Sequence, residues 1–250
     1  MIFVEGETDK TSLDLMLTTI AKNNNLRTHF IVFGTDITQK ENINVSNILK
    51  ELNSAIALGF ANLKRKYKIS LNDITKIYHI VDSDGVYIPD ENVKYINKEH
   101  FKGESKIEYT DKEILTPTVN YIVKRNNRKA SILNLLSSKK EITVSLNNNS
   151  VSIPYSIFYM STNIEHVLHN IQNPSQTQKV DLADEWELNV ADDINKINEF
   201  FDDKNSYVAK GTYIDSWNEL KKDLNSLSRL TNFKLLINDI LELTSDNNDE

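Results

Sequence analysis

Apolar positions in the first 85 residues fall into two alternating patterns. Continuous runs at 2–4, 29–33 and 77–81 are rich in β-branched and aromatic residues, which is typical of buried strands. Between them, apolar residues recur at helical spacing over 13–20 and 45–63. A strand can reach a parallel neighbour only through such a crossover connection. The pattern therefore predicts an α/β fold with a parallel sheet flanked by helices.

After residue 88 the alternation of strand and helix patterns is less regular. We expect 110–136 to be largely helical, and 142–144 and 150–160 to be strands. The prediction is an α/β domain over residues 1–175, with an insertion at about 88–150.

A helical C-terminal region is predicted for residues 176–250. One apolar stripe spans 217–227 and a second spans 233–241, both at helical spacing. These stripes offer more apolar surface than a small sheet needs for cover. We expect part of 176–244 to dock a second copy of the chain or a partner protein. The alternative is that the stripes only pack on each other and on the sheet.

Composition narrows the classes of protein that fit. The chain has 250 residues, of which 39% are hydrophobic and 26% charged, as in ordinary globular proteins. It has no cysteine, which excludes disulfide scaffolds, thiol catalysis and Cys-ligated zinc. No apolar run approaches a membrane span, and an acid follows the first four residues, which are apolar, so we expect a cytoplasmic protein without a signal peptide. The net charge of −7 permits only local nucleic-acid contacts.

Acidic residues follow two of the predicted strands, where open parallel sheets place their binding sites. Glu5 and Gly6 follow the first strand, and Asp82, Asp84 and Gly85 follow the third. Because residues two apart in a strand point to the same side, both aspartates are expected to join Glu5 at one spot. Such ligands suit Mg²⁺ or Mn²⁺, and the glycines would let a phosphate backbone approach. The alternative is a turn whose acids only cap the next helix.

The two acidic segments together resemble those of the Toprim domain, found in topoisomerases, bacterial primases, small nucleases and the overcoming-lysogenization-defect family of defence nucleases. The matching segments are 3–9, FVEGETD, and 80–85, IVDSDG. The resemblance implies a Toprim-like parallel sheet. It also implies that Glu5 is the metal-linked acid/base group and that Asp82 and Asp84 bind magnesium.

A further glutamate lies after the last predicted strand of the sheet domain. The segment 159–168, YMSTNIEHVL, resembles the strand-to-helix corner that carries an additional glutamate in defence nucleases of the Toprim type. That likeness makes Glu165 a fourth catalytic candidate. The alternative is structural, because Asn163 can cap a helix and Glu165 would favour the positive end of its dipole.

Four cations stand within six residues in the predicted insertion. The segment 124–129 reads KRNNRK and contains Lys124, Arg125, Arg128 and Lys129. In an acidic protein this is the best candidate for phosphate contacts, together with Gly6. The alternative is an ordinary solvated helix face.

The rest of the prediction comes from the resemblance and from what the chain lacks. No two of the six glycines have the spacing of a phosphate-binding loop, so an ATPase, if required, would be a second chain. The resemblance implies a toxic nuclease effector of anti-phage abortive infection, cutting RNA such as transfer RNA in preference to DNA. An ATPase subunit would restrain it, and it would act as a homodimer. The alternative is a non-catalytic Toprim module that bridges nucleic acid or a partner protein.

Overall fold

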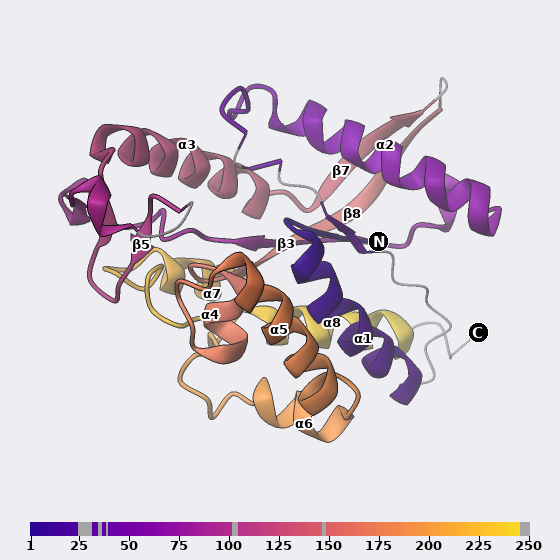
Figure 1. Cartoon of the computed structure of the whole chain (residues 1–250). Coiled ribbons are helices and arrows are strands. Elements are labelled where there is room, and N and C mark those ends of the chain that lie inside the picture. The colour runs from indigo at the N-terminus through magenta and orange to yellow at the C-terminus, as the bar shows by residue number, and fades with distance from the viewer. Residues whose placement is uncertain (25–31, 35–36, 39, 102–104, 147–148, 246–250) are drawn as a thin grey trace.

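A computed structural model shows a five-stranded sheet covered by helices on both faces (Figure 1). The residues that it describes are 1–24, 32–34, 37–38, 40–101, 105–146 and 149–245.

The main sheet has the order β2-β1-β3-β8-β7. Its strands are β2 (Val32–Gly34), β1 (Ile2–Val4), β3 (Ile77–Asp82), β8 (Asn149–Met160) and β7 (Glu141–Leu146). The first four run parallel and β7 is antiparallel to β8. The α/β prediction is confirmed, although the sheet is mixed. Of the second predicted strand, residues 29–31 lie outside the described residues.

Helices α1 (Glu7–Asn23) and α2 (Ile48–Tyr67) are the two predicted crossovers. Strand residues alternate between two cores, as the period of two requires. Phe3, Ile77 and Val81 pack in one core with α2 and with α3 (Val119–Ser137). The neighbouring strand residues face α1 and most of the C-terminal helices on the opposite side (Figure 1). The sheet is therefore buried on both faces.

The predicted insertion contains a second, three-stranded sheet. It consists of β4 (Val93–Tyr95), β6 (Ile114–Thr116) and β5 (Glu108–Tyr109), in that order across the sheet. The prediction of helix over 110–136 is therefore wrong at its start, because β6 precedes α3. The insertion also ends earlier than predicted, since β7 completes the main sheet.

Short helices and the C-terminal region complete the fold. Single 3₁₀ turns occupy Leu71–Asp73, Asp90–Asn92 and Lys98–His100. The C-terminal elements are α4 (Ile164–His169), α5 (Gln176–Trp186), a π-helical turn (Glu187–Ala191), α6 (Ile194–Phe200), α7 (Tyr213–Leu220) and α8 (Phe233–Ser245). None of the described helices is both long and apolar enough to cross a membrane.

The C-terminal region shares its core with the sheet. Phe233 and Leu236 of α8 lie in the same buried cluster as Ile2 of β1. The single stripe predicted over 217–227 is wrong, because α7 ends at Leu220. Leu227 lies beyond the helix and joins a separate cluster with residues of the insertion. The C-terminal region therefore packs on both the main sheet and the insertion.

Candidate carboxylate site

Glu5 and Asp9 both lie at the turn from β1 into α1. Gly6 precedes the first residue of α1, and its N–H donates to Asp9 Oδ2 at 2.8 Å. Through this bond Asp9 caps the helix. Its side chain is buried and also adds a carboxylate to the site. On the other side of Glu5, Thr38 Oγ1 donates to Glu5 Oε1 at 2.6 Å. Glu5 is therefore held in one orientation.

The aspartates after β3 sit on a sharp turn, not on a continued strand. Asp82 is the last strand residue, whereas Asp84 and Gly85 have φ values of 50° and 64°. A Cβ on Gly85 would lie 2.5 Å from Leu227 Cδ2. The expectation that Gly85 leaves room for a phosphate backbone is therefore wrong. This glycine is needed for the left-handed turn and for close packing against the C-terminal region.

Hydrogen bonds tie this turn to the end of β8. The N–H of Ser83 donates to Met160 O at 2.8 Å, and that of Asp84 donates to Thr162 O at 2.9 Å. In return, the N–H of Thr162 donates to Ser83 Oγ at 3.0 Å. These bonds fix the two corners that carry Asp84 and Glu165 relative to each other.

Lys129 of α3 links the two acidic turns. Its Nζ lies 3.1 Å from Glu5 Oε1 and also forms an ion pair with Asp84 Oδ2. The lysine side chain is fully buried. Burial lowers the pKa of Lys129, but the charges of Asp84 and Glu5 outweigh burial, and the net shift is upward. Glu5 and Asp84 thus share one charged ammonium, which places them in one site, as the sequence predicted.

Asp82 is buried within electrostatic reach of four other carboxylates. Burial raises the pKa of Asp82 well above its usual range, and repulsion from Asp9, Glu5, Asp84 and Glu165 raises it further. Burial and the charge of Glu165 raise the pKa of Asp9 as well. All four predicted acidic residues therefore lie in one cluster, with Asp9 as a fifth member.

Glu165 is both close to the cluster and part of a capped helix. Asn163 caps α4 by accepting from the N–H of His166 at 2.8 Å, as the structural alternative expected. Yet Glu165 is only 4% exposed, and Lys179 of α5 reaches its Oε1 at 3.1 Å. Its Oε2 is buried and has no hydrogen-bond partner within the described ranges. A cap alone does not explain a carboxylate buried in this way.

The basic segment 124–129 does not lie together on the surface. Lys129 and Arg125 are buried on the inner side of α3, where Arg125 Nη2 donates to Asp84 O at 3.1 Å. Its Nη1 donates to Tyr109 Oη at 3.3 Å. Lys124 is exposed and Arg128 is half-buried. The predicted patch of four phosphate-binding cations is therefore wrong for Arg125 and Lys129, which instead hold the acidic cluster in place.

Sequence reasoning missed Lys179 and underrated Asp9. Asp9 belongs to the segment FVEGETD and lies in the first turn of α1, shortly after Glu5, and that position could have placed it in the site. Nothing in the sequence marks Lys179, because its position depends on how α5 packs against α1 and α4.

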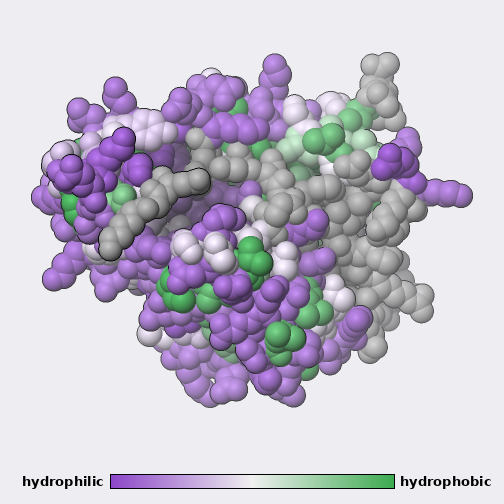
Figure 2. All heavy atoms as spheres, viewed as in Figure 1, coloured by the Kyte–Doolittle hydropathy of each residue, from purple (hydrophilic) through white to green (hydrophobic). Residues whose placement is uncertain are grey.

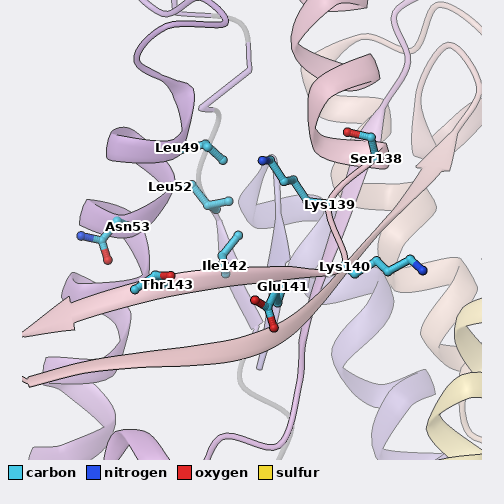
Figure 3. Close-up of a pocket in the computed structure, with 9 residues that line it drawn as sticks. All are labelled: Leu49, Leu52, Asn53, Ser138, Lys139, Lys140, Glu141, Ile142 and Thr143. Atoms are coloured by element: carbon cyan, nitrogen blue, oxygen red, sulfur yellow. The ribbon is translucent and has the colours of Figure 1, made fainter.

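The surface is hollowed between α3 and the pair α4 and α5, and hydrophilic residues surround the hollow (Figure 2). This is the side on which β3 and β8 end. A separate cavity of about 480 Å³ lies between α2 and β7, lined by Leu49, Leu52 and Ile142 among others (Figure 3). None of the five clustered carboxylates lines that cavity.

The side chains of the cluster are chemically suited to a hard cation, but they are not arranged as a metal site. Within the described ranges, no group of three or more acidic or histidine side chains is arranged to hold a metal ion. Two observations nevertheless fit a divalent cation: the mutual repulsion that raises the pKa of Asp82, and the unpartnered Oε2 of Glu165. Carboxylate oxygens are the ligands that Mg²⁺ and Mn²⁺ prefer.

Comparison with protein-family models, with curated proteins and with solved structures finds no match to this chain.

Proposed function

We propose that this chain is a magnesium-dependent nuclease of the Toprim type that cleaves RNA. One observation carries the proposal: Glu5 and Asp84, which come from different strands, meet at the buried ammonium of Lys129, with Asp82 beside them. Three carboxylates gathered at the carboxyl ends of parallel strands suit metal-assisted phosphoryl chemistry. The resemblance of the two acidic segments to Toprim motifs supports the same conclusion.

Each residue of the cluster has a separate role in the proposed reaction. Asp82 and Asp84, with Glu5, would hold Mg²⁺ or Mn²⁺, which stabilises the negative charge that develops on the phosphate during attack. Glu5 positions or deprotonates the attacking nucleophile, and Thr38 and Lys129 keep its carboxylate in place. Glu165 completes the acidic wall opposite α3. Lys129 offsets part of the negative charge that a phosphate would otherwise meet.

The biological setting is proposed from the resemblance. A Toprim effector of this kind acts as a toxin in anti-phage abortive infection, with transfer RNA as a target. A separate ATPase subunit would restrain the chain, and the released form would be a homodimer. The helices after residue 176 provide the surface for these contacts.

Cleavage of labelled transfer RNA by the purified chain with Mg²⁺ tests the proposal. Glu5→Gln, and separately Asp82→Asn combined with Asp84→Asn, should each reduce the cleavage rate by roughly a hundredfold or more. Glu91→Gln is the matched control, because Glu91 is exposed and outside the cluster. Full activity in the cluster variants would overturn the proposal. Toxicity on overexpression that the same substitutions remove would support it in cells.

A second candidate function is a non-catalytic binding module for nucleic acid or a partner protein. One observation favours it: Lys129 already neutralises Glu5 and Asp84, so the cluster is partly satisfied without a metal. A binding module predicts that Asp82→Asn with Asp84→Asn leaves nucleic-acid binding unchanged and that magnesium binds weakly or not at all. The nuclease predicts magnesium binding that depends on both aspartates.

A further inference from the structure

Helix α3 has two faces with different chemistry. Its inner face carries Arg125 and Lys129 toward the acidic cluster, together with apolar residues of the core. On its outer face, Tyr121 is 49% exposed, Lys124 is exposed and Arg128 is half-buried. These three residues stand at i, i+3 and i+7, which is one stripe of a helix.

The charge of α3 is unusual for this protein. The chain has a net charge of −7, yet residues 119–137 contain four cations and no acid. The first turn of α3 has no acidic residue to neutralise the positive end of the helix dipole. Tyr121 lies in this first turn. An exposed aromatic residue alone is ordinary. Here Tyr121 stands at the positive end of a helix whose charged residues are all cations.

The outer stripe is close to the acidic cluster. Arg125 donates to the main-chain oxygen of Asp84 at 3.1 Å and to Tyr109 at 3.3 Å. Burial lowers the pKa of Arg125, but Tyr109, Asp84 and, more weakly, Tyr121 outweigh it and raise the pKa. Tyr121 and Arg125 are four residues apart on α3, so Tyr121 neighbours a side chain that contacts the site. The surface beneath α3 is hollowed and hydrophilic (Figure 2).

We propose that the outer stripe of α3 binds single-stranded nucleic acid, with one base stacked on the ring of Tyr121 and a phosphate at Lys124. The inference rests on the proposed function and names its substrate class. An aromatic ring beside cations is the usual way to hold a single strand, because each base has a flat face and each linkage a charge. Bases in a duplex are stacked on their neighbours and do not offer that face. A bound strand would run from this stripe toward the carboxylates.

Binding without catalysis tests this site separately. The probe is a fluorescent oligouridylate of about 12 nucleotides, followed by anisotropy in EDTA so that no metal-dependent cleavage occurs. Tyr121→Ala should weaken binding by roughly 5- to 150-fold, the equivalent of one lost stacking contact, whereas Tyr121→Phe should bind like the wild type. Tyr95→Ala is the matched control, since Tyr95 is 70% exposed but lies on β4.

Lys124→Ala supplies a second readout. It should lower the slope of log affinity against log salt by about 0.7, the value for one phosphate contact on a single strand. Tyr121→Ala should leave that slope unchanged, because a stacked ring releases no counterion. Lys50→Ala, an exposed lysine on α2, is the control for charge.

The outcomes separate this proposal from the nuclease. Wild-type affinity in Tyr121→Ala, or an equal loss in Tyr95→Ala, would overturn the stacking site even if the protein cleaves RNA. Equal weakening of binding to a duplex of the same length would overturn the assignment to single strands. Specific loss in Tyr121→Ala together with no cleavage by the wild type would support the stacking site and overturn the nuclease.

Discussion

Two lysines neutralise opposite sides of the acidic cluster, and they do so in different ways. Lys129 comes from the insertion, is completely buried and contacts both Glu5 and Asp84. Lys179 comes from the C-terminal region, keeps 27% of its side chain exposed and pairs with Glu165. The lysine on the α3 side is therefore closed off from solvent, whereas the lysine on the α5 side is partly exposed, although Glu165 itself is buried.

The difference suggests how one site can combine stability with access. A buried charge must be paired, so the α3 side is fixed as part of the folded core. A partly exposed lysine is screened by water, so the pair of Lys179 with Glu165 can be exchanged for a ligand at a lower cost. A divalent cation is thus expected to enter past Lys179, while Lys129 keeps Glu5 and Asp84 in position.

The largest expected effect is on the free energy of unfolding when Lys129 is removed. Lys129→Met should lower it by about 3–5 kcal/mol, because two buried carboxylates lose their shared cation. Lys179→Met is the matched variant on the α5 side and should cost less, because water that reaches the exposed part of Lys179 can partly replace its charge beside Glu165. Urea denaturation of both proteins measures the difference. Equal losses would show that the two sides of the cluster are not different.

The next effect concerns the glycine that positions Asp84. Gly85→Ala forces a side chain into φ 64° and against Leu227, so it should destabilise the protein by about 1–3 kcal/mol. Gly6→Ala is the comparison, since Gly6 has φ −128° and the nearest atom to its Cβ would be 3.4 Å away. Thermal unfolding of the two variants should differ accordingly. If Gly6→Ala were the more harmful of the two, the described turn at Asp84 would be wrong.

A smaller effect is expected from pH. Burial and then the charge of Lys129 lower the pKa of His79 to about 3, and burial and then Arg229 lower that of His166 to about 4. Both values lie below the ordinary 6.5, so the unfolded chain takes up protons first as pH falls. The stability that these two neutral histidines contribute is fully present above pH 6.5. It is lost progressively as the pH falls from there toward the pKa values of the folded protein.

Each buried histidine should therefore cost about 1.4 kcal/mol of stability between about pH 7.5 and about pH 5.5. His166→Asn should remove its share of that loss, which urea titrations at the two pH values would measure. His100→Asn is the control, because the His100 side chain is 43% exposed. An unchanged pH dependence in His166→Asn would contradict the burial of this side chain beside Glu165.

The order of elements was predictable because each obeys a local rule. The runs at 2–4 and 77–81 are strands because their β-branched and aromatic residues are buried on both sheet faces. The acids after them gather because parallel strands end at the same edge. The helix predicted from residue 110 was wrong because Ile114–Thr116 pairs with two other strands, a contact that periodicity does not reveal.

The roles of the cations depend on tertiary packing and were not predictable. Lys124 and Lys129 are five residues apart on one helix, yet one faces water and the other lies at the acidic cluster. Only the position of α3 over the strand ends decides which is which. The same holds for Lys179, whose approach to Glu165 depends on the packing of α5.

Calorimetric titration with Mn²⁺ tests the central claim, that the carboxylate cluster takes up a divalent cation for catalysis. The wild-type protein is predicted to bind Mn²⁺, more tightly with RNA present, and Asp82→Asn with Asp84→Asn is predicted to lose that binding. Glu91→Gln should bind like the wild type. Absence of binding by the wild type with RNA present, or the same affinity in the double variant, would contradict the account and favour a binding module.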